Sequence, residues 1–131
     1  MFFRGFGKKK EAEVAETPVV EIDETLTVID REIGIKYCGG IEELYNEVAS
    51  QYAEQGMDYV GKLNTYFEEK DWKNYQIIVH AIKSSSLTIG AVALSEKAKS
   101  LEMAAKEDNH EYIEAEHAVF IKSFQCLLEK M

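Results

Sequence analysis

Apolar residues recur at helical spacing along the chain from residue 41 onward. The first run steps by three, four or multiples of these, which places its members on one face of a helix. Its tyrosines also repeat every seven residues through Gly56, so the register is not broken there. We therefore predict one helix over 41–70, which can bend at Gly56. The stripe that this helix should turn to the core comprises Leu44, Val48, Tyr52, Tyr59, Leu63 and Tyr66.

Three further amphipathic helices follow with short connections. Asp71 can cap a helix over 72–90, the next helix covers 91–106, and Asp108-Asn109 can start the last one. Upstream, Gly39-Gly40 ends a short helix around residues 30–37. Because no β-strand pattern is present, these elements predict an all-α fold. The fold class is an antiparallel four-helix bundle with a short N-terminal helix and a flexible N-terminal arm.

The arm differs in composition from the rest. Residues 1–10 carry four basic side chains and three phenylalanines, and residues 11–24 hold the only proline and read as a linker. We predict a flexible basic tip and linker over 1–24 and one bundle domain over 25–131. A basic, aromatic tip can touch a membrane surface. Chain ends are commonly unordered, however, so no firm membrane contact is expected.

Charge and cysteine content exclude several classes of protein. The chain of 131 residues has 15 Lys and Arg against 24 Asp and Glu, a net charge of −9, which opposes nucleic-acid binding. Cys38 and Cys126 lie far apart, form no C-x-x-C motif and fit a reducing compartment. No apolar stretch approaches the ~20 residues of a membrane span. We expect a cytoplasmic protein.

His80 is the candidate reactive residue. The inward stripe of its helix is Tyr75, Ile78, Val79, Ile82, Ser86 and Ile89, and His80 lies off that stripe with Gln76, Lys83, Ser84 and Leu87. Lys83 follows three residues later, on the same face. An imidazole nitrogen beside a cation can accept a phosphoryl group. A lone histidine with a lysine at this spacing is nevertheless common on helix surfaces.

Residues 80–102, which read HAIKSSSLTIGAVALSEKAKSLE, make the prediction more specific. The stretch resembles the histidine phosphotransfer (HPt) domain family, whose pattern runs H-x-L-K-G-[S/A]-x-x-x-(I/L)-G-x-x-x-L and reaches an acidic or amide residue at Glu102. The upstream Ile35-x-Tyr-Cys-Gly-Gly also resembles the lead-in of bacterial members. One position departs from the family, since Ser84 stands where glycine is usual.

The resemblance implies a role for each matching residue. His80 would be the phosphorylated nucleophile, Lys83 would steady the phosphoryl oxygens, and Glu102 would accept a hydrogen bond from the imidazole Nδ1–H. Gln76, Ser84 and Leu87 would border the docking surface. The partners would be response-regulator receiver domains and a hybrid histidine kinase. The chain itself would need no cofactor, because Mg²⁺ would sit on the receiver domain.

The chain carries no glycine-rich phosphate loop, so we expect a phosphocarrier and not a kinase. Counted from Gly90, His80 lies ten residues before the turn and Glu102 twelve after, hence at nearly the same level of two antiparallel helices. A helical adaptor that binds its partner without being phosphorylated is the alternative. Glu107-x-x-His110 and Glu114-x-x-His117 match half of a di-iron motif but fall in one stretch, so no metal site is expected.

Overall fold

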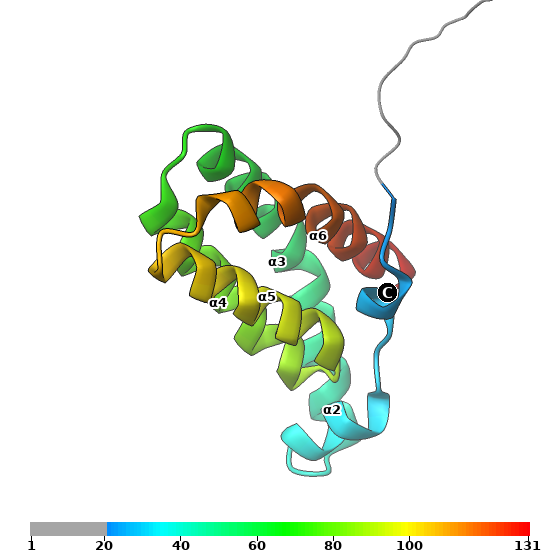
Figure 1. Ribbon diagram of the computed structural model, residues 1–131. Helices are drawn as coiled ribbons and strands as arrows, with labels where there is room; N and C mark the ends of the chain where they lie inside the picture. The colour runs from blue at the N-terminus through cyan, green and yellow to red at the C-terminus, as the bar shows by residue number, and fades with distance from the viewer. Residues whose placement is uncertain (1–20) are drawn as a thin grey trace, which may run out of the picture.

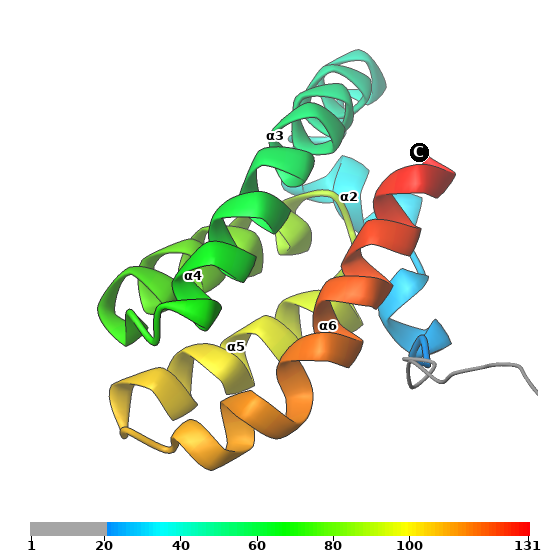
Figure 2. The same ribbon diagram turned by 90° about the horizontal axis from the view of Figure 1, so that it is seen from above.

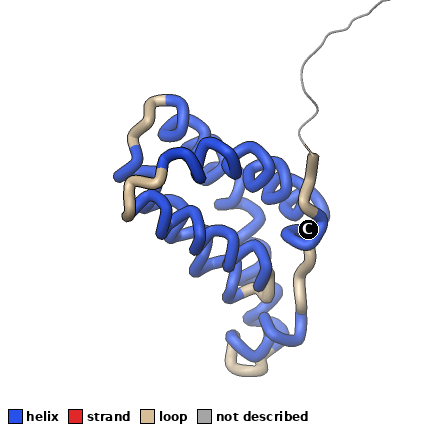
Figure 3. The backbone as a smooth tube through the Cα atoms, viewed as in Figure 1, coloured by secondary structure: helices blue, strands red, loops and turns tan. Residues whose placement is uncertain are grey.

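A computed structural model describes residues 21–131; the predicted basic tip and most of the predicted linker, residues 1–20, lie outside the described residues. All regular structure in the described part is helical (Figure 3). A short 3₁₀ helix, η1 (Glu24–Thr27), and the short α2 (Arg31–Tyr37) precede four longer helices. These are α3 (Glu42–Glu68), α4 (Trp72–Thr88), α5 (Val92–Lys106) and α6 (His110–Lys130). The predicted antiparallel four-helix bundle with a short helix before it is confirmed.

Polar caps fix where several of these helices begin. The Asp71 carboxylate accepts a hydrogen bond from the Asn74 backbone N–H, as predicted from the sequence. Asn109 caps α6 through Tyr112 N–H, and Asp30 caps α2 through Glu32 and Ile33 N–H. Each cap satisfies backbone donors that the first helical turn leaves unpaired. The starts of α4 and α6 are therefore determined locally.

The core lies between the inner faces of α3 to α6, which pack as neighbouring pairs (Figure 2). Its fully buried side chains come from all four helices and include Leu63, Tyr75, Val79, Ile82, Leu94, Leu101, Ile113, Phe120 and Leu127. Polar groups inside the core are paired, as burial requires. For example, the hydroxyls of Tyr52 and Ser86 lie 2.7 Å apart and join α3 to α4.

Three details differ from the sequence prediction. Leu44 is 41% exposed, because it lies about 100° round the helix from the buried Tyr45. Ile78 is only half-buried. The helix η1 was not predicted: it starts at the last residue of the predicted linker, and the Asp23 backbone N–H before it donates to Ser123 Oγ of α6 at 2.9 Å.

The short helix α2 closes the end of the bundle where α4 turns into α5 (Figure 1). Asp30, its cap, donates its backbone N–H to the Gly90 carbonyl at 2.8 Å. Gly90 has a φ of 91°, and a Cβ there would overlap the Asp30 carbonyl. The α4–α5 turn is thus in close contact with the start of α2.

None of the helices within residues 21–131 combines the length and apolar composition that a membrane span requires.

Candidate functional site

His80 lies in the middle of α4 on its solvent side. Its side chain is 56% exposed, whereas Tyr75, Val79 and Ile82 of the same helix are fully buried. The imidazole follows Val79 by one residue, about 100° round the helix, so it projects away from the core. The ring is open to a molecule that approaches from outside.

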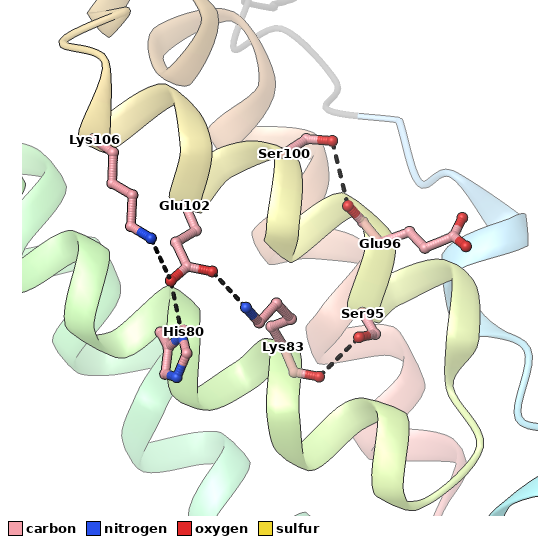
Figure 4. Close-up of polar contacts among 7 residues, drawn as sticks. All are labelled: His80, Lys83, Ser95, Glu96, Ser100, Glu102 and Lys106. Atoms are coloured by element: carbon pink, nitrogen blue, oxygen red, sulfur yellow. Dashed lines mark hydrogen bonds and ion pairs between the residues drawn. The ribbon is translucent and has the colours of Figure 1, made fainter.

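The buried carboxylate of Glu102, on α5, holds one edge of this ring (Figure 4). Glu102 is only 4% exposed, and its Oε2 lies 2.7 Å from His80 Nδ1. Burial raises the pKa of Glu102, but hydrogen bonds from Lys83 and His80 and their charges outweigh it, so that its pKa lies below the ordinary value.

An ionised carboxylate can only accept hydrogen bonds, so the proton of a neutral His80 must be on Nδ1. The lone pair is then on Nε2, the nitrogen away from Glu102.

Lys83 binds the other oxygen of the same carboxylate. Its Nζ is 2.8 Å from Glu102 Oε1, and its side chain is 27% exposed. Lys106 approaches from one turn further along α5, with its Nζ 3.8 Å from Oε2. Glu102 is therefore surrounded by His80 and two ammonium groups. Lys106 was not predicted, although its i+4 spacing from Glu102 is a usable signal.

Ser95 is a second residue that the sequence analysis missed. It is 5% exposed, and its hydroxyl donates to the backbone carbonyl of Lys83 at 2.8 Å. Two small, fully buried residues flank it, Ala91 at the start of α5 and Ala98 within it, and allow the helices to approach. Ser95 thus ties α5 to the α4 turn that carries Lys83. In the sequence it lies in a run of Ser, Lys and Glu and gives no signal of burial.

The three residues expected at the border of a docking surface lie on the His80 side of α4. Ser84 is exposed, and Gln76 and Leu87 are half-buried. Ile77, which the sequence analysis did not single out, is 56% exposed three residues before His80. Its position off the inward stripe could have indicated from the sequence that this isoleucine is exposed. The outward side of α4 near His80 therefore carries apolar as well as polar side chains.

The serines that follow Lys83 differ in their surroundings. Only Ser84 faces outward. The hydroxyl of Ser85 bonds back to the Ala81 carbonyl at 2.8 Å, and Ser86 is buried against Tyr52. Of these three serines, only Ser84 therefore lies on the surface beside His80.

The other two histidines are in different environments. His110 stacks on Trp72, with ring centroids 4.7 Å apart. His117 is 5% exposed and bonds Tyr75 and Asn64. Among residues 21–131, no group of three or more His, Cys, Asp and Glu side chains is arranged to bind a metal ion.

The arrangement around His80 suits nucleophilic attack by Nε2. The nucleophile faces solvent, its ring orientation is fixed by a buried anion, and a lysine lies within one turn.

Comparison with known proteins gives one match. A family model described as Hpt domain matches residues 47–131, more than half of the chain, including His80, Lys83 and Glu102. The match begins within α3, after the Ile35 to Gly40 lead-in. No curated protein and no solved structure matched the chain in the two further comparisons.

Proposed function

The chain belongs to the family of Hpt domains, which take part in histidine phosphotransfer within phosphorelays, and we propose that His80 is its phosphoacceptor. In this proposal a receiver-domain aspartate donates the phosphoryl group to His80. The chain then passes it to the aspartate of another receiver domain in a two-component system.

The contact between His80 Nδ1 and Glu102 Oε2, at 2.7 Å, is the observation that carries the proposal. It leaves Nε2 unprotonated and directed outward, as a nucleophile toward phosphorus requires. A solvated histidine without such a partner would exchange between two tautomers and many ring orientations. The buried carboxylate removes both kinds of freedom before the donor arrives.

In the forward step the Nε2 lone pair attacks phosphorus and a P–N bond forms. The bond between phosphorus and the aspartyl oxygen breaks, and its electron pair stays on the departing carboxylate. The Nδ1 proton remains on the ring, hydrogen-bonded to Glu102, which offsets the positive charge that the phosphorylated imidazole acquires. Lys83 has further N–H groups with which to stabilise the phosphoryl oxygens. Transfer onward reverses these changes.

The remaining chemistry belongs to the partners. Hpt domains are phosphocarriers and not kinases, and a receiver domain would supply Mg²⁺ and the acyl phosphate. We propose response-regulator receiver domains and a hybrid histidine kinase as partners. Cys38 and Cys126 are free thiols, which supports a cytoplasmic location.

Incubation with a phosphorylated receiver domain tests the proposal. We expect the chain to acquire a phosphate that is labile in acid and stable in base, as a phosphoramidate is. The variant His80→Gln should acquire none and should keep its helical circular dichroism spectrum, because the exposed ring leaves little cavity. His110→Gln is the matched control and should be phosphorylated normally. A chain that binds the receiver domain without acquiring phosphate would be an adaptor, and the proposal would be wrong.

A further inference from the structure

Charge is unevenly distributed among the helices. In a chain with a net charge of −9, α4 contains no acidic residue, and α4 and α5 together carry five lysines and two glutamates. One of these glutamates, Glu102, is buried and hydrogen-bonded to His80. By contrast, α3 carries six acidic residues and one lysine. The side of the bundle formed by α4 and α5 is therefore basic, and the neighbouring solvent side of α3 is acidic.

Four of the lysines lie on the side of α4 and α5 from which His80 is exposed. Lys83 and Lys106 contact the Glu102 carboxylate that binds the Nδ1 edge of the His80 ring (Figure 4). Lys73 lies seven residues before His80, and Lys99 lies seven before Lys106, so each shares the outward face of its helix. Lys99 lies three residues before Glu102 on α5, about one turn from the residue that contacts His80. We call Lys73, Lys83, Lys99 and Lys106 the lysine ring.

Two members of the lysine ring, Lys73 and Lys99, are exposed and form no ion pair within the described residues. Over residues 21–131, no ion pair joins Lys73 or Lys99 to an acidic side chain. Lys97, the remaining lysine of α5, points to α6 and pairs with Glu116. Glu96 is the exposed acidic residue of α5. Lysine charge thus exceeds acidic charge on the surface that an incoming donor must meet.

We propose that the lysine ring is a docking surface for an acidic face of the partner, and that it guides this face onto His80. The inference rests on the proposed function, because it assumes that a receiver domain brings an acyl phosphate to His80. That acyl phosphate is itself an anion and is attracted by the same lysines. A cluster of basic residues on an otherwise acidic protein creates a local positive potential, and this potential attracts an acidic partner to that part of the surface. The acidic side of α3 repels the same partner, so that charge selects the orientation as well as the encounter.

The variant Lys73→Gln/Lys99→Gln tests the lysine ring without altering the residues that contact Glu102. The probe is an isolated receiver domain with acidic residues around its phosphorylated aspartate. At low ionic strength we expect kcat/KM for transfer to fall about 10-fold, with kcat at saturation unchanged. Added salt should slow transfer to the wild-type chain more than transfer to the variant. Salt screens the attraction between lysines and acidic residues, and the variant has already lost part of that attraction.

The control variant Lys36→Gln/Lys122→Gln removes the same charge from exposed lysines of α2 and α6. It should transfer at the wild-type rate. If it loses as much as Lys73→Gln/Lys99→Gln, only net charge matters and the docking surface is refuted. Equal rates and equal salt dependence for Lys73→Gln/Lys99→Gln and the wild type would also refute it.

A small phosphodonor separates this inference from the proposed function. Phosphoramidate does not dock as a protein does, so wild type and Lys73→Gln/Lys99→Gln should acquire phosphate on His80 from it at similar rates. Phosphate on neither chain, from phosphoramidate or from the receiver domain, would overturn the proposed function. The affinity of the receiver domain for both chains, measured by calorimetry, would still test the lysine ring: unchanged affinity at low salt overturns it.

Discussion

Glu102 binds His80 through Oε2 and Lys83 through Oε1, so one carboxylate orients both residues to which we assign the phosphotransfer. This arrangement separates their roles. The histidine keeps an exposed nitrogen for reaction, while its other nitrogen is held in the groove between α4 and α5. Lys83 is held near the ring even before a phosphoryl group arrives. We regard Glu102 as a positioning residue, since it contacts His80 Nδ1 and not Nε2, the nitrogen that we propose as the nucleophile.

Glu102→Ala should therefore slow phosphate acceptance by about 10- to 100-fold without abolishing it. In ¹⁵N spectra the His80 ring should change from one tautomer to a mixture. Glu102→Gln should restore part of the rate, because its side-chain oxygen can still accept from Nδ1–H. Glu96→Ala is a matched control on the same helix, at an exposed glutamate that does not contact His80. A wild-type rate and tautomer in Glu102→Ala would remove Glu102 from the site.

Lys83→Ala should slow transfer by about 10- to 1,000-fold, since an electrostatic contribution is lost while the nucleophile stays in place. Single-turnover transfer from a phosphorylated receiver domain measures the effect. Lys122→Ala, on the exposed side of α6, serves as the control. If Lys83→Ala transfers as fast as the wild type, the lysine has no part in the reaction.

At the scale of the helices, the crossing of α3 and α6 depends on Gly56. A Cβ built on Gly56 would lie 2.5 Å from Leu128 Cδ2 and 3.2 Å from its Cγ, whereas Gly61 has open space around it. Leu128 is 7% exposed, so its side chain is packed within the bundle. The glycine that the sequence offered as a bend therefore serves as a contact point between two long helices.

We predict opposite effects of alanine at the two glycines of α3. Gly61→Ala should raise the free energy of unfolding by up to about 1 kcal/mol, through helix propensity alone. Gly56→Ala should lower it by about 1 kcal/mol, because overpacking against Leu128 exceeds that gain. Urea denaturation compares the two variants. The double variant Gly56→Ala/Leu128→Ala should show coupling between the residues, and independent effects would contradict the close contact.

For the molecule as a whole, His117 is a buried group that links three helices. Its Nδ1 lies 2.9 Å from the Tyr75 hydroxyl of α4 and its Nε2 2.9 Å from Asn64 Oδ1 of α3, and its ring stacks on Phe67. Burial lowers the pKa of His117 from 6.5 to about 4. The folded state therefore favours the neutral ring, with Nε2–H donating to Asn64 and Nδ1 accepting from Tyr75.

The bundle should lose stability in mild acid for this reason. The contribution of His117 is complete above its ordinary pKa of 6.5 and is lost as the pH falls toward 4, by up to about 3 kcal/mol. Between pH 6.5 and 5, the free energy of unfolding of the wild type should fall more steeply than that of His117→Gln. His110→Gln should keep the wild-type slope. Equal slopes for the wild type and His117→Gln would contradict a neutral buried ring.

Much of this architecture was predictable, because it follows from local patterns. The seven-residue tyrosine repeat gave α3 to within two residues at either end, and Asp71 gave the start of α4. Counting from Gly90 placed His80 and Glu102 at one level of their helices. That Glu102 leans toward His80 depends on the packing of α4 against α5, including the Ser95 bond, which no local pattern encodes. The docking of η1 on α6 is likewise a long-range contact.

Phosphorus–nitrogen coupling in NMR spectra of the phosphorylated chain tests the central claim most directly, since it identifies both the histidine and the ring nitrogen. The account predicts phosphate on Nε2 of His80, with the Nδ1 proton retained and hydrogen-bonded to Glu102. Phosphate on Nδ1 of His80, or on His110 or His117, would contradict it.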